Sequence, residues 1–320
     1  MRPSKAYVRL VSHLFFQGRF LTTNHRWLNH LILAQLRILK HLPISKPIIK
    51  PIFIVGIGRS GSTILGKVLS MHKDIGFLNE PKAIWYSLIP EDDVNGHFTS
   101  QYAQYRFDAT NATENVINEA HHIFSFYLTV TGTQRLLDKN PEIIFRIPFV
   151  QKIFPDAKFI FLARNGWDTV RSITEWSKKF GKEVNGQVED WWGVNQRKWE
   201  FLKQQLVPLE PMLSEIATTI QNTKRHEDMA AIEWILTMQT GIRHMQTMPE
   251  WFFYVRYEDL TKKPREVLTE LSDFCGLQED KTFLRYAEKV LIHSKSKRAL
   301  KLSLPLEEPF SKTMAILNYL

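Results

Sequence analysis

The chain of 320 residues carries 42 Lys and Arg against 33 Asp and Glu, a net charge of +9, and 44% of its residues are hydrophobic. This apolar content excludes a disordered chain. The basic balance fits a polyanionic ligand, an acidic acceptor, nucleic acid or an anionic membrane. A single cysteine, Cys275, excludes an intrachain disulfide and a cysteine-based zinc site, and it suits a reducing cytosol.

Residues 1–48 are predicted to form a basic, helical N-terminal segment. Between Trp27 and Leu42 the apolar residues recur at the spacing of an amphipathic helix, interrupted by polar side chains. The segment lacks about 20 consecutive apolar residues, so we expect no membrane-spanning helix. No signal-peptide pattern is present, and a cytoplasmic location is expected. We expect this helix to pack on the rest of the domain; because its polar face is basic, peripheral membrane contact is the second interpretation.

After three prolines, apolar β-branched runs alternate with helix-periodic segments. Strands are predicted at residues 52–55, 75–78, 135–137, 157–163 and 251–255. Helices are predicted at 63–71, 113–130, 142–154, from about 167, and at 188–205, 228–248 and 264–274. Residues 90–112 are polar and irregular, which indicates a loop or lid. The alternation predicts an α/β domain over residues 49–320, with three αβα layers and a mainly parallel central sheet.

The segment GIGRSGST at residues 56–63 lies between the first predicted strand and a helix. Its glycines allow a tight turn with N–H groups pointing inward, and the helix N-terminus adds partial positive charge, so the loop is suited to an anion. A glycine turn without a ligand is the alternative. The residues expected to bind phosphate here are Arg59, Ser60, Gly61, Ser62 and Thr63.

The loop departs from the one that binds nucleoside triphosphates. Gly56 and Gly61 have the spacing of G-x-x-x-x-G-K-[ST], but Ser62 stands in the lysine position. No apolar strand ends in an acidic residue suited to magnesium, which argues against ATP or GTP hydrolysis. A dinucleotide fingerprint is also disfavoured, because Glu80, at the distance of the ribose-binding acid, precedes a proline in another context. No metal is implied, since the histidines form no ligand cluster.

A second strand–helix junction carries Arg164 at the end of the strongest predicted strand, with Ser172 two turns into the following helix. Ligands of open α/β sheets bind outside the carboxyl ends of the strands. Arg164 and Ser172 are therefore predicted to bind a second phosphate, with a surface arginine and a helix-facing serine as the alternative.

Four segments in this order resemble sulfotransferases that use 3′-phosphoadenosine-5′-phosphosulfate (PAPS). Residues 59–63 resemble the family's 5′-phosphosulfate loop, and 164–172 its 3′-phosphate segment. Residues 138–141, followed by FPDAKF at 154–159, resemble its K-[ST]-P…F-P-x-A-K-F pattern, and 256–260 its R-Y-E-D-L. The similarity is greatest to the tyrosylprotein and bacterial branch, and it covers roughly residues 50–275. It implies a sulfotransferase fold like that of P-loop NTPases, PAPS as donor and a hydroxyl acceptor.

The resemblance also implies roles for individual residues. Glu80 matches the branch's general base, although Asn79 stands where that branch has glycine. Arg59 would stabilise charge on the leaving phosphate, and Lys139 would reach the sulfuryl oxygens, with a solvent-exposed lysine as its alternative. In the family a late basic loop covers the 3′-phosphate, which makes Lys297 and Arg298 candidates.

Three other functions remain open at this point. A small-molecule kinase would need the missing lysine and magnesium carboxylate. A non-catalytic nucleic-acid or membrane module would need a basic stripe with interleaved aromatics, whereas the basic residues are dispersed, so no nucleic acid is expected. A degenerate sulfotransferase would bind the nucleotide alone. The acceptor and the oligomeric state are not predicted; four tryptophans, at 176, 191, 192 and 199, are expected mainly in helix cores.

Overall fold

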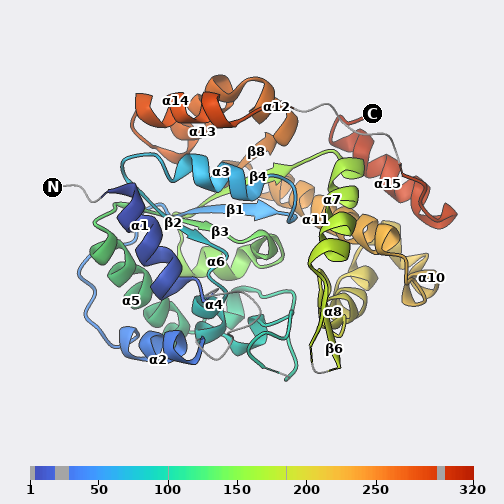
Figure 1. Cartoon of the computed structure of the whole chain (residues 1–320), viewed down its shortest axis with the longest axis horizontal. Helices are drawn as coiled ribbons and strands as arrows, with labels where there is room; N and C mark the ends of the chain where they lie inside the picture. The colour runs from blue at the N-terminus through green and yellow to red at the C-terminus, as the bar shows by residue number, and fades with distance from the viewer. Residues whose placement is uncertain (1–3, 19–28, 100, 185, 294–299) are drawn as a thin grey trace.

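The computed structural model describes residues 4–18, 29–99, 101–184, 186–293 and 300–320. Five strands form one sheet in the order β2-β3-β1-β4-β8, and every neighbouring pair is parallel (Figure 1). The strands are β1 Ile52–Gly56, β2 Ile75–Asn79, β3 Arg135–Lys139, β4 Lys158–Ala163 and β8 Phe252–Arg256. Because all five are parallel, their carboxyl ends meet at one edge of the sheet.

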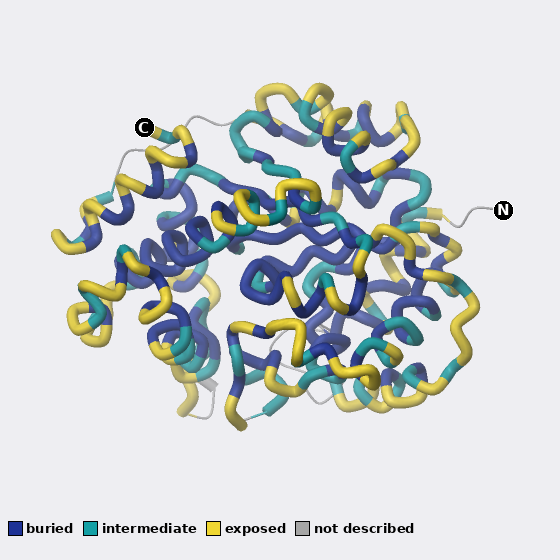
Figure 2. The backbone as a smooth tube through the Cα atoms, turned by 180° about the vertical axis from the view of Figure 1, so that it is seen from behind, coloured by how far each residue is buried: buried dark blue, intermediate teal, exposed yellow. Residues whose placement is uncertain are grey.

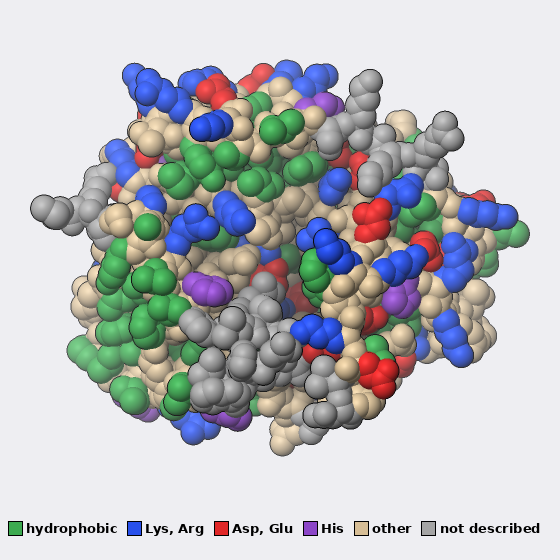
Figure 3. Space-filling view, in the orientation of Figure 1, with side chains coloured by type: hydrophobic (Ala, Val, Ile, Leu, Met, Phe, Trp, Pro, Cys, Tyr) green, Lys and Arg blue, Asp and Glu red, His purple; other side chains and the backbone are tan. Residues whose placement is uncertain are grey.

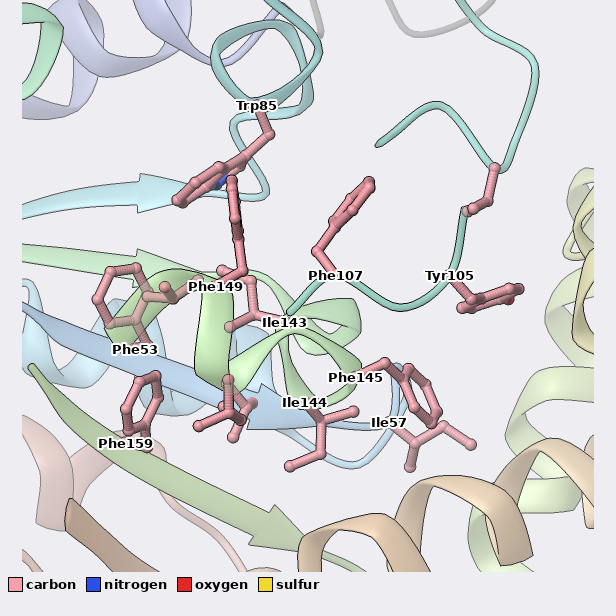
Figure 4. Packing of buried hydrophobic residues seen from close by; sticks show 14 of the residues in the cluster. Phe53, Ile57, Trp85, Tyr105, Phe107, Ile143, Ile144, Phe145, Phe149 and Phe159 are labelled. Atoms are coloured by element: carbon pink, nitrogen blue, oxygen red, sulfur yellow. The ribbon is translucent and has the colours of Figure 1, made fainter. Parts of the chain in front are cut away.

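Alternation along β1 builds both faces of the core. Ile52 and Ile54 belong to one buried cluster, whereas Phe53 and Val55 belong to the other. The ring centroids of Phe53 and Phe159 lie 5.6 Å apart, so β1 and β4 share a stacked aromatic pair (Figure 4). Buried strands run through the middle of the molecule between two layers of helices (Figure 2), which confirms the predicted αβα architecture.

The helices of one layer are α3 Ser62–Leu69, α12 Tyr257–Lys262, α13 Pro264–Cys275 and α14 Lys281–Val290. On the opposite face lie α4 Lys82–Leu88, α5 Glu114–Thr131 and α6 Ile147–Ile153. Beyond the carboxyl edge are α7 Gly166–Phe180, α8 Arg197–Gln205, α9 Pro211–Ser214, α10 Ala217–Gln221 and α15 Leu304–Ile316. Helix α11 His226–Thr247 extends from there onto the sheet face that α4, α5 and α6 cover, where Gly241 packs against the Phe161 ring and His244 stacks on Phe252. The short 3₁₀ turns are Pro90–Asp92, Ala109–Asn111, Pro141–Phe145, Val207–Leu209 and Pro249–Trp251.

The N-terminal segment packs on the domain. It forms α1 Lys5–Val11, a π-helical turn η1 Ser12–Phe16 and α2 Asn29–Leu39. Phe16 and Leu36 belong to the same buried cluster as Phe53. The expectation that the amphipathic helix covers the core is therefore confirmed.

The helix predicted over 188–205 is wrong in its first half. The chain there forms an antiparallel three-stranded sheet of β5 Lys182–Val184, β6 Gln187–Asp190 and β7 Gly193–Val194, and only α8 is helical. Gly193, Asn195 and Gln196 have φ values of 81°, 50° and 59°. A right-handed helix does not accommodate consecutive left-handed residues, so α8 begins only after them.

The single helix predicted over 142–154 is interrupted. A 3₁₀ turn ends at Phe145, Arg146 adopts a non-helical conformation, and α6 begins at Ile147. Pro148 explains the break, because proline lacks an N–H donor and is tolerated only in the first turn of a helix.

Candidate active site

A cavity of about 530 Å³ lies at the carboxyl edge of the sheet. Its floor includes the loop after β1, Glu80 after β2 and Lys139 at the end of β3. Its far wall includes Trp176 of α7, Trp191 between β6 and β7, and several side chains of the β5–β6 hairpin. The small antiparallel sheet, which the sequence analysis missed, therefore contributes directly to the site.

The loop after β1 is held in shape by tight packing against two aromatic rings. A Cβ atom on Gly61, whose φ is 97°, would lie 2.3 Å from the Tyr257 ring. A Cβ atom on Gly58 would lie 2.4 Å from the Trp191 ring. Both positions therefore require glycine: Gly61 on conformational and steric grounds, and Gly58 on steric grounds alone.

The predicted phosphate-binding residues of this loop do not all face the cavity. Arg59, Ser62 and Thr63 line it. The Ser60 side chain is buried, and its hydroxyl donates a hydrogen bond of 2.6 Å to the carbonyl oxygen of Ile57. Ser60 therefore stabilises the turn from within the loop.

We expect Gly61→Ala to lower thermal stability and to abolish the nucleotide binding predicted for this loop, because the new methyl group displaces the Tyr257 ring and the left-handed backbone is strained. Gly276→Ala is the matched control, since Gly276 has a φ of 63° but no atom within 4 Å of the added methyl group. That control should cost about 1 kcal/mol of stability and keep binding. Thermal unfolding with and without adenosine 3′,5′-bisphosphate measures both effects; equal losses in the two variants would contradict the steric argument.

Arg59, Arg164 and Ser172 are brought together from two separate strand–helix junctions. The Arg59 Nε donates to the Ser172 Oγ at 3.2 Å, and the Arg164 Nη1 donates to the Arg59 carbonyl oxygen at 3.1 Å. The parallel pairing of Gly56 with Leu162 explains this, because it aligns the two loops that follow β1 and β4. Burial, and then the nearby Arg164 charge, lower the pKa of Arg59. Two adjacent guanidinium groups favour a bound anion.

The segment after β8 supports this cluster in a way that the sequence analysis did not assign. The Arg164 guanidinium lies 5.0 Å from the centroid of the Tyr257 ring, which also packs against Gly61. The Glu258 carboxylate accepts hydrogen bonds from the Asn165 N–H at the start of α7 and from the Tyr319 hydroxyl, each 2.9 Å long. The R-Y-E-D-L motif marks this segment in the sequence, but its contacts are to residues distant along the chain, so the motif alone did not show its role.

Glu80 and Lys139 form an ion pair inside the cavity. Their strands are neighbours, with Asn79 paired to Lys139, and the Glu80 N–H donates to the Lys139 carbonyl oxygen at 2.7 Å. The Lys139 side chain is only 2% exposed, so the alternative of a solvent-exposed lysine is wrong. Glu80 has a φ of 51°, a strained conformation that directs the chain sharply away after β2.

Asp138, the residue before Lys139, is fully buried. Its Oδ2 accepts a hydrogen bond of 2.7 Å from the Trp85 Nε1, and its Oδ1 has no hydrogen-bond partner among the described residues. Burial raises the pKa of Asp138 to about 7. The folded chain therefore keeps this carboxyl protonated at pH values where the unfolded chain has released the proton.

The free energy of unfolding should consequently decrease as the pH rises from 4 to 7, because in this range the Asp138 carboxyl ionises in the unfolded chain but stays protonated in the folded one. The shift from 3.8 to about 7 corresponds to about 4 kcal/mol. We expect Asp138→Asn, which cannot ionise, to remove this pH dependence. Denaturant unfolding of the parent chain and of Asp138→Asn at several pH values gives the difference between their free energies of unfolding, in which the contributions of all other titrating groups cancel. A difference that does not change with pH would contradict the prediction.

Two further lysine–glutamate pairs line the cavity. Lys198 Nζ lies 2.6 Å from Glu233 Oε1, and the Trp191 Nε1 donates to Glu233 Oε2 at 2.7 Å, so the indole against Gly58 is fixed from behind. Lys82 and Glu142 form the other pair. Burial alone would raise the pKa of Glu142, but the ammonium groups of Lys82 and Lys198 hold it below its ordinary value.

Trp191 was expected in a helix core and instead lies in a turn of the small sheet, at the cavity wall. Trp192 and Trp199 are buried and pack against each other, with centroids 5.5 Å apart. Lys297 and Arg298 lie outside the described residues. Among the residues that the structure describes, no three His, Cys, Asp or Glu side chains are grouped to hold a metal ion. Within the same ranges, no helix has the length and apolar composition needed to cross a bilayer.

Comparison with known proteins places this geometry in a family. A family model described as "Sulfotransferase family" matches residues 51–213. The nodulation protein NoeE of Sinorhizobium fredii is 26% identical over 250 residues, covering 73% of this chain and 51% of that protein. The protein-tyrosine sulfotransferase of Drosophila melanogaster is 32% identical over 128 residues, covering 38% of this chain and 24% of that protein. The chain thus spans about half and about a quarter of the length of these relatives.

A solved sulfotransferase domain from the curacin biosynthetic pathway has a TM-score of 0.52 to this structure at 18% identity, covering 86% of this chain and 99% of that one. At this identity the likeness concerns the fold, and it confirms the predicted fold class. The family model covers half of the chain, including the loop after β1 and the Arg164–Ser172 junction. The chain belongs to the sulfotransferase family.

Proposed function

We propose that the chain transfers a sulfuryl group from PAPS to an acceptor hydroxyl, using the unit at residues 49–320. The observation that carries this proposal is the position of Arg59. Its side chain lines the cavity that contains the Glu80–Lys139 pair, and it also hydrogen-bonds to Ser172 beside Arg164. One loop therefore joins an anion-binding cluster to a carboxylate–lysine pair, as transfer between two substrates requires.

The donor would bind across both loops. The N–H groups at the start of α3, with Ser62 and Thr63, would hold the 5′-phosphosulfate. Arg164 and Ser172 would hold the 3′-phosphate, and the mutual repulsion of Arg59 and Arg164 would be relieved by the bound phosphates. Lys297 and Arg298 remain candidates for a further contact with the 3′-phosphate.

In the transfer step the acceptor oxygen would form a bond to sulfur while the bond from sulfur to the bridging phosphate oxygen breaks. Glu80 would accept the hydroxyl proton, and Lys139 would stabilise charge on the sulfuryl oxygens. Arg59 and the loop N–H groups would stabilise the charge that develops on the leaving 5′-phosphate. Adenosine 3′,5′-bisphosphate and the sulfated acceptor are the products.

Transfer of labelled sulfuryl from PAPS to a panel of tyrosyl peptides, saccharides and lipids tests the proposal. The relatives named as protein-tyrosine sulfotransferases place tyrosyl peptides on this panel. Labelled ATP with magnesium tests the kinase alternative, which the Ser62 position disfavours. Label transfer from ATP and none from PAPS would overturn the proposal, and binding of adenosine 3′,5′-bisphosphate without transfer to any acceptor would indicate a degenerate enzyme.

A further inference from the structure

The net charge of the chain lies entirely in its first 50 residues. They contain nine of the 42 Lys and Arg residues and none of the 33 Asp and Glu residues, so the other 270 residues have 33 of each. The first acidic residue in the chain is Asp74. The apparently dispersed positive charge is therefore one basic N-terminal segment attached to a neutral domain.

The same segment exposes large apolar side chains. Among the described residues, fifteen large hydrophobic side chains are exposed, and seven of these precede residue 50. We call the five that lie on α1, η1 and α2 the N-terminal apolar face: Tyr7, Leu10, Phe15, Leu31 and Ile38. Single exposed apolar residues are ordinary, whereas a concentration of them marks an interaction surface.

Helix α2 carries apolar side chains beyond the side that packs on the domain. Ile32 and Leu36 are buried against the domain, whereas Leu31 and Ile38 are 63% and 65% exposed. Leu31 and Ile38 are seven residues apart, so both lie on the same outer side of the helix. Arg37, next to Ile38, is also exposed. Packing on the domain therefore leaves part of the helix's apolar surface exposed.

The exposed residues of α1 and η1 lie beside this helix. The Gln35 side-chain amide of α2 donates a hydrogen bond of 3.0 Å to the carbonyl oxygen of Phe15. Tyr7 and Leu10 of α1 are exposed, and Arg9 between them is exposed as well. Figure 3 shows hydrophobic side chains gathered on the side of the molecule where α1 and α2 lie in Figure 1.

We propose that the N-terminal apolar face docks on the surface of an anionic membrane. Exposed leucine and isoleucine side chains with flanking arginines match the boundary between acyl chains and anionic headgroups. Nucleic acid is a poorer match, because aliphatic side chains offer no stacking surface for bases. A second copy of the chain is also a poorer match, because the segment is uniformly basic and would repel itself.

The docking face adjoins the cavity. Gly18, two residues after η1, and Asn29, at the start of α2, both line it. A docked chain would therefore hold the cavity next to the lipid headgroups, where an acceptor carried by the membrane is within reach. This consequence rests on the proposed sulfuryl transfer, whereas docking itself does not.

Flotation of the full chain with phosphatidylcholine vesicles, with and without phosphatidylserine, tests the proposal. We expect flotation only with phosphatidylserine, and weaker flotation at high salt. Arg9→Gln with Arg37→Gln should weaken binding about 30-fold, since each charge near such a surface contributes about fivefold. Leu31→Ser with Ile38→Ser should abolish binding.

Matched controls come from the rest of the surface. Ile292→Ser with Leu304→Ser replaces two side chains that are 76% and 80% exposed, and Lys178→Gln with Lys312→Gln removes two exposed charges. These variants should float like the parent chain. Three results would each overturn the proposal. The first is equal binding to neutral vesicles, and the second is an equal loss of binding in the control variants. The third is a dimer, seen by sedimentation without lipid, that the Leu31 and Ile38 changes abolish. Soluble-acceptor transfer by the face variants reports separately on the proposed function.

Discussion

Replacing Glu80 by glutamine is expected to lower the rate of sulfuryl transfer by about 1,000-fold, within the range for loss of a general base. Glutamine keeps the size of the side chain and can accept a hydrogen bond from Lys139, but it cannot take the acceptor proton. The effect should appear in kcat, measured with saturating PAPS and any acceptor found in the panel. Affinity for adenosine 3′,5′-bisphosphate should remain within a few-fold of the parent value.

Glu142→Gln is the matched control for this experiment, because Glu142 also lines the cavity and is also paired with a lysine, Lys82. It should change kcat by less than about tenfold, as expected for a group that takes no proton in the reaction. Comparable losses in the two variants would indicate that the Glu80 effect is electrostatic or structural and would remove Glu80 as the base.

Replacing Arg59 by alanine is expected to lower kcat by about 100-fold and to weaken donor binding, because charge that grows on the leaving phosphate loses the cation that we assign to it. Arg59→Lys keeps one positive charge but loses the planar fork that reaches both the phosphate and Ser172. It should therefore recover only part of the activity. Steady-state kinetics with varied PAPS separates the effect on kcat from the effect on KM.

Ser172→Ala provides the comparison for Arg59, since it removes the hydrogen-bond partner at 3.2 Å and leaves the guanidinium in place. A loss mainly in nucleotide affinity is expected, because Ser172 is assigned to the 3′-phosphate and not to the phosphate that leaves. Near-normal turnover in Arg59→Ala would remove Arg59 from the proposed mechanism.

The local order of the chain was predictable from the sequence. Strand β4 was recognised because Phe159 to Leu162 form a continuous apolar run, and such a run is buried wherever the chain folds. The loop after β1 was recognised because the conformational demands of glycine act over a few residues. The same kind of reasoning also gave a wrong helix: the segment before α8 has the composition of a helix, but Asn195 and Gln196 adopt left-handed conformations that composition does not predict.

Sequence alone thus predicted the α/β class, the positions of two candidate anion-binding loops, and Glu80 and Lys139 as separate candidates. Only the tertiary structure showed which of these candidate residues contact one another. Arg59 reaches Ser172 across 113 residues, Lys139 pairs with Glu80 across 59, and Trp191 packs against Gly58 from a sheet that no periodicity predicted. The physical reason for the first two contacts is that strand order determines them: a parallel sheet brings the carboxyl ends of β1, β2, β3 and β4 together, and no spacing along the chain encodes that order.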